Sequence, residues 1–544
     1  MTAWRTITRA LILPMVVAAA APALASDYAE LAGLQTEWRA FQKGPVRDGA
    51  PDYSPAALAT QAAGLKRFQQ RLAALDIAGW SVAQKIDYNL VRAEMNGLDF
   101  DVRVARPWQR DPAWYVSIWS AQSDTPAHEG PVHAMPVELW TYQFPLSPAA
   151  SAKLTRELAH VPPLLAAAPR QLTGNARDLW TASVRNIAEQ RAALADLATR
   201  AGTGDLALTA AIAAATRATT DFEAWVKAEA PKKTGPSGVG KEHYSWFLRN
   251  VQLSPNSWDD EVAILSRELA RSHAALRLEE HRNRDLPPLV GASSPAEYDA
   301  LQRRSVVKFV DFLDKQQILT TADYMVPALM AQIGTYKPPA EQDFFQIVRT
   351  RAPLTLFTHF YHWFDLAREA RTPNPSPIRS QPLLYNIWLS RAEGQATAFE
   401  EAMLHAGLFD DDRRAREIVW IMQAQRAARG LASLYAQANM IDLAAAMKMQ
   451  VDRTPNGFMS ADLPLLAFEQ QTYLRLPGYG PSYITGKAMV DKLFAETAEA
   501  RGTKFRVRDF YDELNTYGMI PVPLIRWQMI GKDDEANAMG LRTK

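Results

Sequence analysis

Apolar residues recur every three to four positions along most of the chain, a spacing that predicts amphipathic helices. The clearest examples cover residues 58–75, 81–98, 206–226, 257–284, 295–314 and 413–437. Residues suited to N-capping begin several of them, namely Ser81, Asp205, Asn256 or Ser257, Ser294, and Asp411 or Asp412. No stretch alternates steadily between apolar and polar positions. We therefore expect an all-α fold, a large multi-helix bundle with a central cleft.

A break in the helical pattern divides the chain. Residues 231–240 hold three glycines and two prolines, which cannot continue a helix and predict a linker or lid hinge. We expect an N-terminal helical part over 26–230 and a C-terminal helical part over 241–544. The Ala-rich stretch 149–230 predicts three scaffold helices, and 478–487 predicts a loop that enters a helix ending at Gly502.

Residues 1–25 have the features of a secretory signal peptide. Arg5 and Arg9 precede an apolar run over 10–22, and Ala23-Leu24-Ala25 matches a cleavage site. We expect the mature chain to begin at Ser26, to be periplasmic or secreted, and to have no membrane span after cleavage.

Charge and cysteine content exclude several classes of protein. Cleavage would remove two arginines and no acids, so the formal charge of +1 would become −1. This balance gives no electrostatic footprint for nucleic acid or an anionic membrane surface. The chain has no cysteine, which excludes disulfides, thiol catalysis, cysteine zinc sites and lipid attachment at an N-terminal cysteine.

Aromatic residues crowd the proline-interrupted segment 107–148. They are Trp108, Trp114, Tyr115, Trp119, Trp140 and Tyr142, with His128 and His133 among them. Such a segment can line a substrate groove. It can equally pack its rings as a buried layer against helices.

Three side chains in the central stretch are candidate metal ligands. His359 and His362 are three residues apart, so on one helix they would share a face. Glu393 follows 34 residues after His359, and two histidines with one glutamate give the three-ligand set of a catalytic zinc site. Alternatively, the histidines pack within the surrounding aromatic residues.

The acidic residue that would act as general base in such a site is missing from its usual position. In these enzymes a glutamate directly after the first histidine serves as general base, and here that residue is Phe360. Glu400 and Asp365 are the candidate replacements. Tyr483 could donate a hydrogen bond to an oxyanion or simply pack in a turn.

A glutamate at position 393 lies among small and apolar residues, so burial would require a partner for its charge. Arg426 and Arg429, one turn apart on a later helix, are the candidate partners. A purely structural ion pair and metal ligation both remain open for Glu393.

Four stretches resemble the bacterial family catalogued as domain of unknown function 885. They are Lys241–Phe247, Arg391–Leu408 with Glu393 at the family's metal-ligand glutamate, Pro477–Leu493, and Phe505–Leu524. The resemblance implies a helical fold like that of zinc peptidases.

The chain departs from the family's hallmark, H-E-x-x-P-G-H. Aligning Phe360-Tyr361-His362 with P-G-H places Leu356-Phe357 at the H-E pair. Aligning His359 with the first histidine instead leaves Phe360 at the glutamate. A second family segment, R-x-x-x-D-x-G-x-H, falls on residues 429–437, where Ser433 and Gln437 replace the acid and the histidine. The resemblance is thus to a divergent branch with a degenerate motif.

The residues and the resemblance leave two functions open. The first is an exported, metal-dependent peptidase or amidase with zinc on His359, His362 and Glu393. The second is a metal-free, catalytically degenerate relative that binds a peptide-like ligand. In either case Tyr244, Arg429 and Lys487 are the candidate residues for binding a small peptide-like molecule.

Overall fold

The computed structural model describes residues 27–128 and 133–543. It is 69% helix and 2% strand, which confirms the all-α class. The strands of the described residues form two short pairs. The first is antiparallel, β1 (Val46–Arg47) with β2 (Ala50–Pro51), and the second is parallel, β3 (Ile118–Trp119) with β4 (Val137–Glu138).

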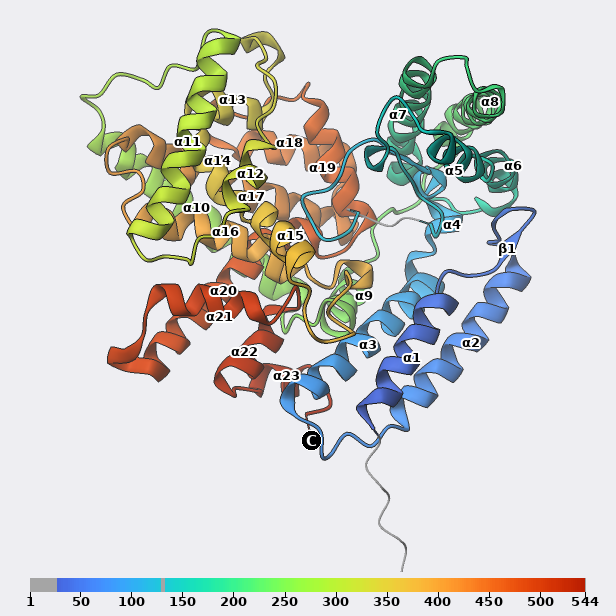
Figure 1. The fold of residues 1–544 in the computed structure, drawn as a ribbon, viewed down its shortest axis with the longest axis horizontal. Helices are drawn as coiled ribbons and strands as arrows, with labels where there is room; N and C mark the ends of the chain where they lie inside the picture. Colours follow the sequence, from blue (N-terminus) through green and yellow to red (C-terminus); the bar gives the residue numbers. More distant parts are fainter. Residues whose placement is uncertain (1–26, 129–132, 544) are drawn as a thin grey trace, which may run out of the picture.

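The helices fall into three groups (Figure 1). The first group is α1 (Tyr28–Phe41), α2 (Pro55–Ala73) and α3 (Val82–Phe100). The second forms a lobe at the upper right and is α4 (Pro107–Arg110), α5 (Pro148–Leu158), α6 (Val161–Gln171), α7 (Arg177–Ala201) and α8 (Leu206–Glu229). The third forms the main body and is α9 (Lys241–Phe247), α10 (Trp258–Arg282), α11 (Pro295–Lys315), α12 (Met325–Met330), α13 (Phe344–Arg351), α14 (Pro353–His359), α15 (Tyr361–Arg371), α16 (Leu389–His405), α17 (Arg413–Gln437), α18 (Leu443–Arg453), α19 (Pro464–Arg475), α20 (Tyr479–Arg501), α21 (Val507–Thr516), α22 (Val522–Ile530) and α23 (Asp534–Ala538).

Most of the predicted helix starts are confirmed. Ser81, Asp205, Ser257, Ser294 and Asp412 accept a hydrogen bond from a backbone N–H in the first turn of α3, α8, α10, α11 and α17. Two predictions were wrong. Residues 149–230 contain four long helices, because the chain turns between α5 and α6. Residues 479–487 are already helical, since α20 starts at Tyr479 directly after Gly478, whose φ is +86°.

Two large hydrophobic cores hold these groups together. The larger one combines α1–α3 with the main body, and a buried ion pair between Asp87 Oδ1 and Arg379 Nε, 2.6 Å apart, joins the same parts. The smaller one lies within the α4–α8 lobe and extends to Ala432 and Leu443 of the main body. The cores therefore group α1–α3 with the main body, whereas the predicted boundary at 231–240 groups them with the lobe.

A close contact between α16 and α20 lies at the centre of the main body. A Cβ added at Gly394 would lie 2.6 Å from Cα of Gly486, and one added at Gly486 would lie 2.7 Å from the backbone oxygen of Ser390. Both separations are shorter than side-chain atoms allow. The two glycines therefore permit the backbones of α16 and α20 to touch, and Glu393 lies directly beside this contact.

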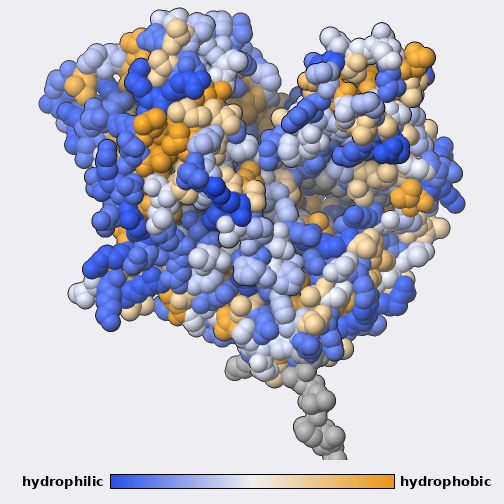
Figure 2. All heavy atoms as spheres, in the orientation of Figure 1, coloured by the Kyte–Doolittle hydropathy of each residue, from blue (hydrophilic) through white to orange (hydrophobic). Residues whose placement is uncertain are grey.

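A groove of about 560 Å³ separates the α4–α8 lobe from the main body. Asn186 and Glu189 of α7 line one side, and Phe468 and Gln471 of α19 line the other. The space-filling view shows the surface hollowed between the two (Figure 2). The central cleft of the sequence prediction remains a prediction, since this groove lies at the side of the main body.

The predicted signal peptide, residues 1–25, lies outside the described residues. Within the part of the chain that the structure describes, every helix is too short or too polar to span a bilayer.

The glycine contact gives a stability prediction. Gly394→Ala should lower the free energy of unfolding by about 1–3 kcal/mol, because the added methyl group overpacks two backbones that cannot easily separate. Gly33→Ala is the matched control, since Gly33 lies on the exposed face of α1 with nothing within 4 Å of its Cβ position. The control should be neutral or more stable by about 0.5–1 kcal/mol. Denaturant unfolding of both variants checks this, and equal stabilities would contradict the prediction.

Candidate metal centre

His359 and His362 lie on two helices, and the prediction of one shared helix was wrong. His359 is the last residue of α14 and His362 is the second residue of α15, with Phe360 at the junction. The hydroxyls of Thr355 and Thr358 each donate to the backbone carbonyl three residues earlier, at 2.7 and 2.6 Å. Such bonds compete with the helical ladder and bend helices, which accounts for a break without proline or glycine.

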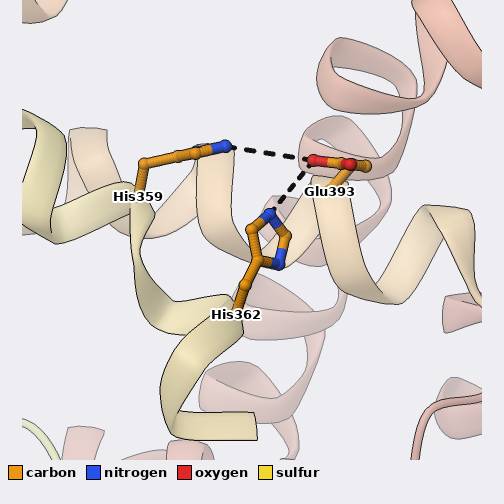
Figure 3. A group of neighbouring side chains, drawn as sticks. All are labelled: His359, His362 and Glu393. Carbon is orange, nitrogen blue, oxygen red and sulfur yellow. Dashed lines mark hydrogen bonds and ion pairs between the residues drawn. The ribbon is translucent and has the colours of Figure 1, made fainter. Parts of the chain in front are cut away.

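The break still brings both imidazoles to one carboxylate (Figure 3). Nε2 of His362 lies 3.1 Å from Oε2 of Glu393, and Nε2 of His359 lies 3.9 Å from the same oxygen. One ligand atom from each residue lies within 4.8 Å of the others, and all three residues are buried. Tetrahedral zinc with bonds of about 2.0–2.2 Å needs ligand atoms about 3.3–3.6 Å apart, so small side-chain rotations would complete the geometry. This buried group could hold a metal ion.

The outer atoms of two of these side chains also have polar neighbours. Nδ1 of His359 lies 2.9 Å from Oε1 of Glu400, and the hydroxyl of Tyr479 donates to Oε1 of Glu393 at 2.8 Å. Carboxylates and hydroxyls in these positions orient metal ligands and raise their basicity. The Tyr479 hydrogen bond is a supporting contact of this kind, and Glu400 lies close enough to His359 to supply a second.

Burial and charge shift the protonation of the group. Burial lowers the pKa of His359 well below its usual range, and the charges of Arg426 and His362 lower it further. Burial also lowers the pKa of His362, but the Glu393 carboxylate more than offsets this and raises it to about 9. The same pairing with His362 outweighs burial and keeps the pKa of Glu393 low. Without metal, His362 and Glu393 are therefore an ion pair, and a metal ion would have to displace the proton of His362.

The two acids predicted as general bases both have cationic partners. Asp365 lies 3.1 Å from Nη1 of Arg391 and 2.9 Å from Nη2 of Arg368. Glu400 lies 2.6 Å from Nη2 of Arg426. Burial raises the pKa of Glu400 to about 7, although Arg426 opposes the rise. Glu400 lies beside Nδ1 of His359, the ring nitrogen that faces away from Glu393. A carboxylate in this position can orient the ring.

The predicted ion pair between Glu393 and the arginines of α17 does not form. Arg426 pairs with Glu400, and Arg429 pairs with Glu469 of α19. His362 and Tyr479 occupy the positions beside Glu393 instead. The sequence could not distinguish these partners, because α16, α17, α19 and α20 all present polar side chains to one buried region.

The structure brings Tyr483 and Arg429 close to the group but places Tyr244 and Lys487 elsewhere. The Tyr483 ring stacks 6.1 Å from His359, and the Arg429 guanidinium lies 4.0 Å from the ring centre. Tyr244 is buried and donates to Glu261 at 2.6 Å. Lys487 forms ion pairs of 3.0 Å with Glu401 and 2.6 Å with Asp491. Substrate binding by Tyr244, Arg429 and Lys487 stays a prediction.

Two residues near the group were missed from the sequence. Tyr479 lies one turn before Tyr483 on α20, so helical spacing could have indicated it. Asp124 lines a pocket of about 90 Å³ together with His362, and its charge raises the pKa of His362. Asp124 belongs to the aromatic segment 107–148, and no local pattern indicates that this loop reaches α15.

Comparison with known proteins identifies the family. The model of the family described as "Bacterial protein of unknown function (DUF885)" matches residues 32–395 and 359–529. The chain belongs to this family. No curated protein gives a significant match.

Two solved structures share the fold. A protein described as a "putative lipoprotein of unknown function" from Shewanella oneidensis is 15% identical, with a TM-score of 0.68 over 93% of this chain and 100% of that chain. A "putative lipoprotein" from Colwellia psychrerythraea is 13% identical, with a TM-score of 0.65 over 92% of this chain and 98% of that chain. At these identities the likeness concerns the fold alone.

The geometry gives a metal-binding prediction. Protein purified without chelator and loaded with zinc should retain about one ion per chain, and Glu393→Gln should retain almost none because a third of the ligand set is lost. Glu369→Gln is the control, since Glu369 lies on α15 and pairs with Arg368 outside the group. Metal analysis after dialysis checks both variants. Equal zinc content in wild type and Glu393→Gln would show that the metal binds elsewhere.

Proposed function

We propose that the chain is an exported zinc-dependent hydrolase that cleaves amide bonds in small peptide-like substrates. The observation that carries this proposal is the convergence of His359, His362 and Glu393 within 4.8 Å. Among the described residues, it is the one group of three side chains with metal-ligand geometry. Two histidines and one carboxylate leave a fourth zinc position open, as catalytic zinc sites do.

Zinc in this position would polarise a substrate carbonyl and lower the pKa of water. The protein side chains supply the remaining roles. Glu400, 2.9 Å from Nδ1 of His359, would orient that ring, and the Tyr479 hydroxyl donates to the Glu393 carboxylate. Tyr483, whose ring stacks beside His359, would donate to the oxygen of the tetrahedral intermediate.

Asp124 is the best-placed candidate for the general base. It lines the pocket that His362 lines, and it also lines the groove between the lobe and the main body. It therefore stands between the metal group and a route by which substrate could enter. Asp124 would thus take the role of the glutamate in the sequence motif, whose position is occupied by Phe360 in this chain. Asp365 and Glu400 are less suited, because arginines neutralise both.

Export rests on the signal-peptide pattern of residues 1–25. The names of the two similar structures, both called lipoproteins, support the same location. Because this chain has no cysteine, it would be released as a periplasmic or secreted protein without a lipid on an N-terminal cysteine.

The second candidate function is binding of a peptide-like ligand without metal or catalysis. The observation that favours it is the His362–Glu393 pair at 3.1 Å, which satisfies both buried charges without an ion. The two functions differ in one respect that can be measured. A hydrolase gains activity when zinc is added, whereas a metal-free binder keeps the same ligand affinity after chelation.

The role of Asp124 gives a prediction for activity. Zinc-loaded wild type should hydrolyse at least one member of a dipeptide and N-acyl-amino-acid panel. Asp124→Asn should lower kcat by about 10²–10⁴-fold, the usual contribution of a general base, with unchanged zinc content. Asp285→Asn is the control, because Asp285 is exposed beyond α10.

Two results would contradict this assignment. Hydrolysis by Asp124→Asn at the wild-type rate would exclude Asp124 as the base. A complete lack of hydrolysis by zinc-loaded wild type across the panel would favour the metal-free binding function.

A further inference from the structure

A second cavity, of about 330 Å³, has no part in the proposed chemistry. It lies where α3 meets the loop before α16, and its size falls at the lower end of the range for ligand pockets. Six aromatic side chains line it, namely Tyr53, Phe100, Trp108, Trp114, Phe247 and Tyr385. Tyr53 stacks on Trp108 with ring centres 5.8 Å apart and planes at 4°, and it meets Trp114 edge-on at 5.7 Å.

One carboxylate stands among these rings. Asp101 directly follows α3, at the start of a π-helical turn over Asp101–Ala105, and lines the cavity. Its side chain has neither a hydrogen bond nor an ion pair with any of the described residues. Burial raises the pKa of Asp101 to about 7, and no neighbouring cation opposes the rise. A half-buried carboxylate without a partner is costly, and π-helical turns often mark functional sites.

The wall opposite α3 is held in a strained conformation. Tyr385 has a φ of +57°, a left-handed conformation that is unfavourable in a residue other than glycine. Its ring packs directly on Gly97 of α3, one turn before Asp101, and Gln252 donates to its backbone oxygen at 2.8 Å. This packing and this hydrogen bond therefore stabilise an unfavourable backbone conformation, which places the Tyr385 ring near the Asp101 carboxylate.

The other charged residues of the lining do not neutralise Asp101. Arg475 lies 2.6 Å from Asp111, and His128 lies 2.9 Å from Glu138. Lys43 is exposed to solvent. Asp52 accepts a hydrogen bond from the backbone of Ser54 at 2.8 Å and lies 3.9 Å from Nη1 of Arg47, which balances its charge. The cavity thus combines aromatic faces with one carboxylate that has no cationic partner among the described residues.

We propose that this cavity binds an organic ammonium group, with Asp101 as its counter-ion and the aromatic faces around its apolar stem. Aromatic rings attract cations through their negative faces, most strongly where water is excluded. A bound ammonium group would also supply the partner that Asp101 lacks. A neutral ligand could donate a hydrogen bond to that carboxylate but would not compensate its charge, and an anionic ligand would repel it.

The site also points to a substrate class, and this step rests on the proposed hydrolase function. Pro382 lines both this cavity and the small pocket of His362 and Asp124. The two sites are therefore neighbours, and one substrate could reach both. Substrates that carry an ammonium group, such as a free peptide N-terminus or a lysine side chain, would be preferred.

The test is a binding measurement on the full mature protein by isothermal titration calorimetry. Benzylammonium and benzyl alcohol are the probes, because they share a shape and differ in charge. Wild type should bind benzylammonium at least about tenfold more tightly than the alcohol, and Asp101→Asn should abolish this difference, since a charge-assisted contact is lost. Asp221→Asn, which removes an exposed carboxylate on α8, should bind as wild type does. The melting temperatures of both variants verify folding.

Treatment with a chelator separates this inference from the proposed function. Binding of benzylammonium should persist after the metal has been removed. A chelated protein that has lost hydrolase activity should therefore bind benzylammonium as before. Equal affinity for the two probes, absence of benzylammonium binding at millimolar concentration, or unchanged binding by folded Asp101→Asn would each overturn the proposal. A charge preference that persists without Asp101 would place the ammonium site elsewhere.

Discussion

The contact between Gly394 and Gly486 determines much of what surrounds the candidate metal centre. Because neither residue has a side chain, the backbones of α16 and α20 approach until a single added carbon would collide with the opposite chain. Glu393 precedes one glycine, and Tyr479 and Tyr483 lie two turns and one turn before the other. The contact therefore places a carboxylate from one helix against the hydroxyl of Tyr479 from the other, at 2.8 Å. A larger residue at either position would separate these groups.

Around this contact the main body buries an unusual number of charges in pairs. Glu400 is held by Arg426, Asp365 by Arg391, and Glu469 by Arg429. Burying such pairs gains little stability over apolar packing, while removing one partner is strongly destabilising. The network of ion pairs therefore serves mainly to fix the orientation of the side chains in it. His359, His362 and Glu393 lie beside this network and face one another.

Local patterns in the sequence predicted most of the helices and indicated the three candidate ligands. Caps such as Ser257 and Asp412 act within one turn, so spacing alone reveals them. The position of Asp124 depends instead on a loop packing more than 230 residues away along the chain, which no local pattern encodes. The helix break at Phe360 depends on which hydroxyls bond to the backbone, and a threonine-rich helix can equally remain straight. The arginine partners could not be predicted because several helices converge on one buried region.

The central claim is that His359, His362 and Glu393 form one metal site. Anomalous diffraction at the zinc absorption edge, from crystals grown with zinc, tests it most directly. The account predicts one strong peak about 2.0–2.2 Å from Nε2 of both histidines and from a carboxylate oxygen of Glu393. A map with no peak there, in which His362 is bonded directly to Glu393, would contradict it.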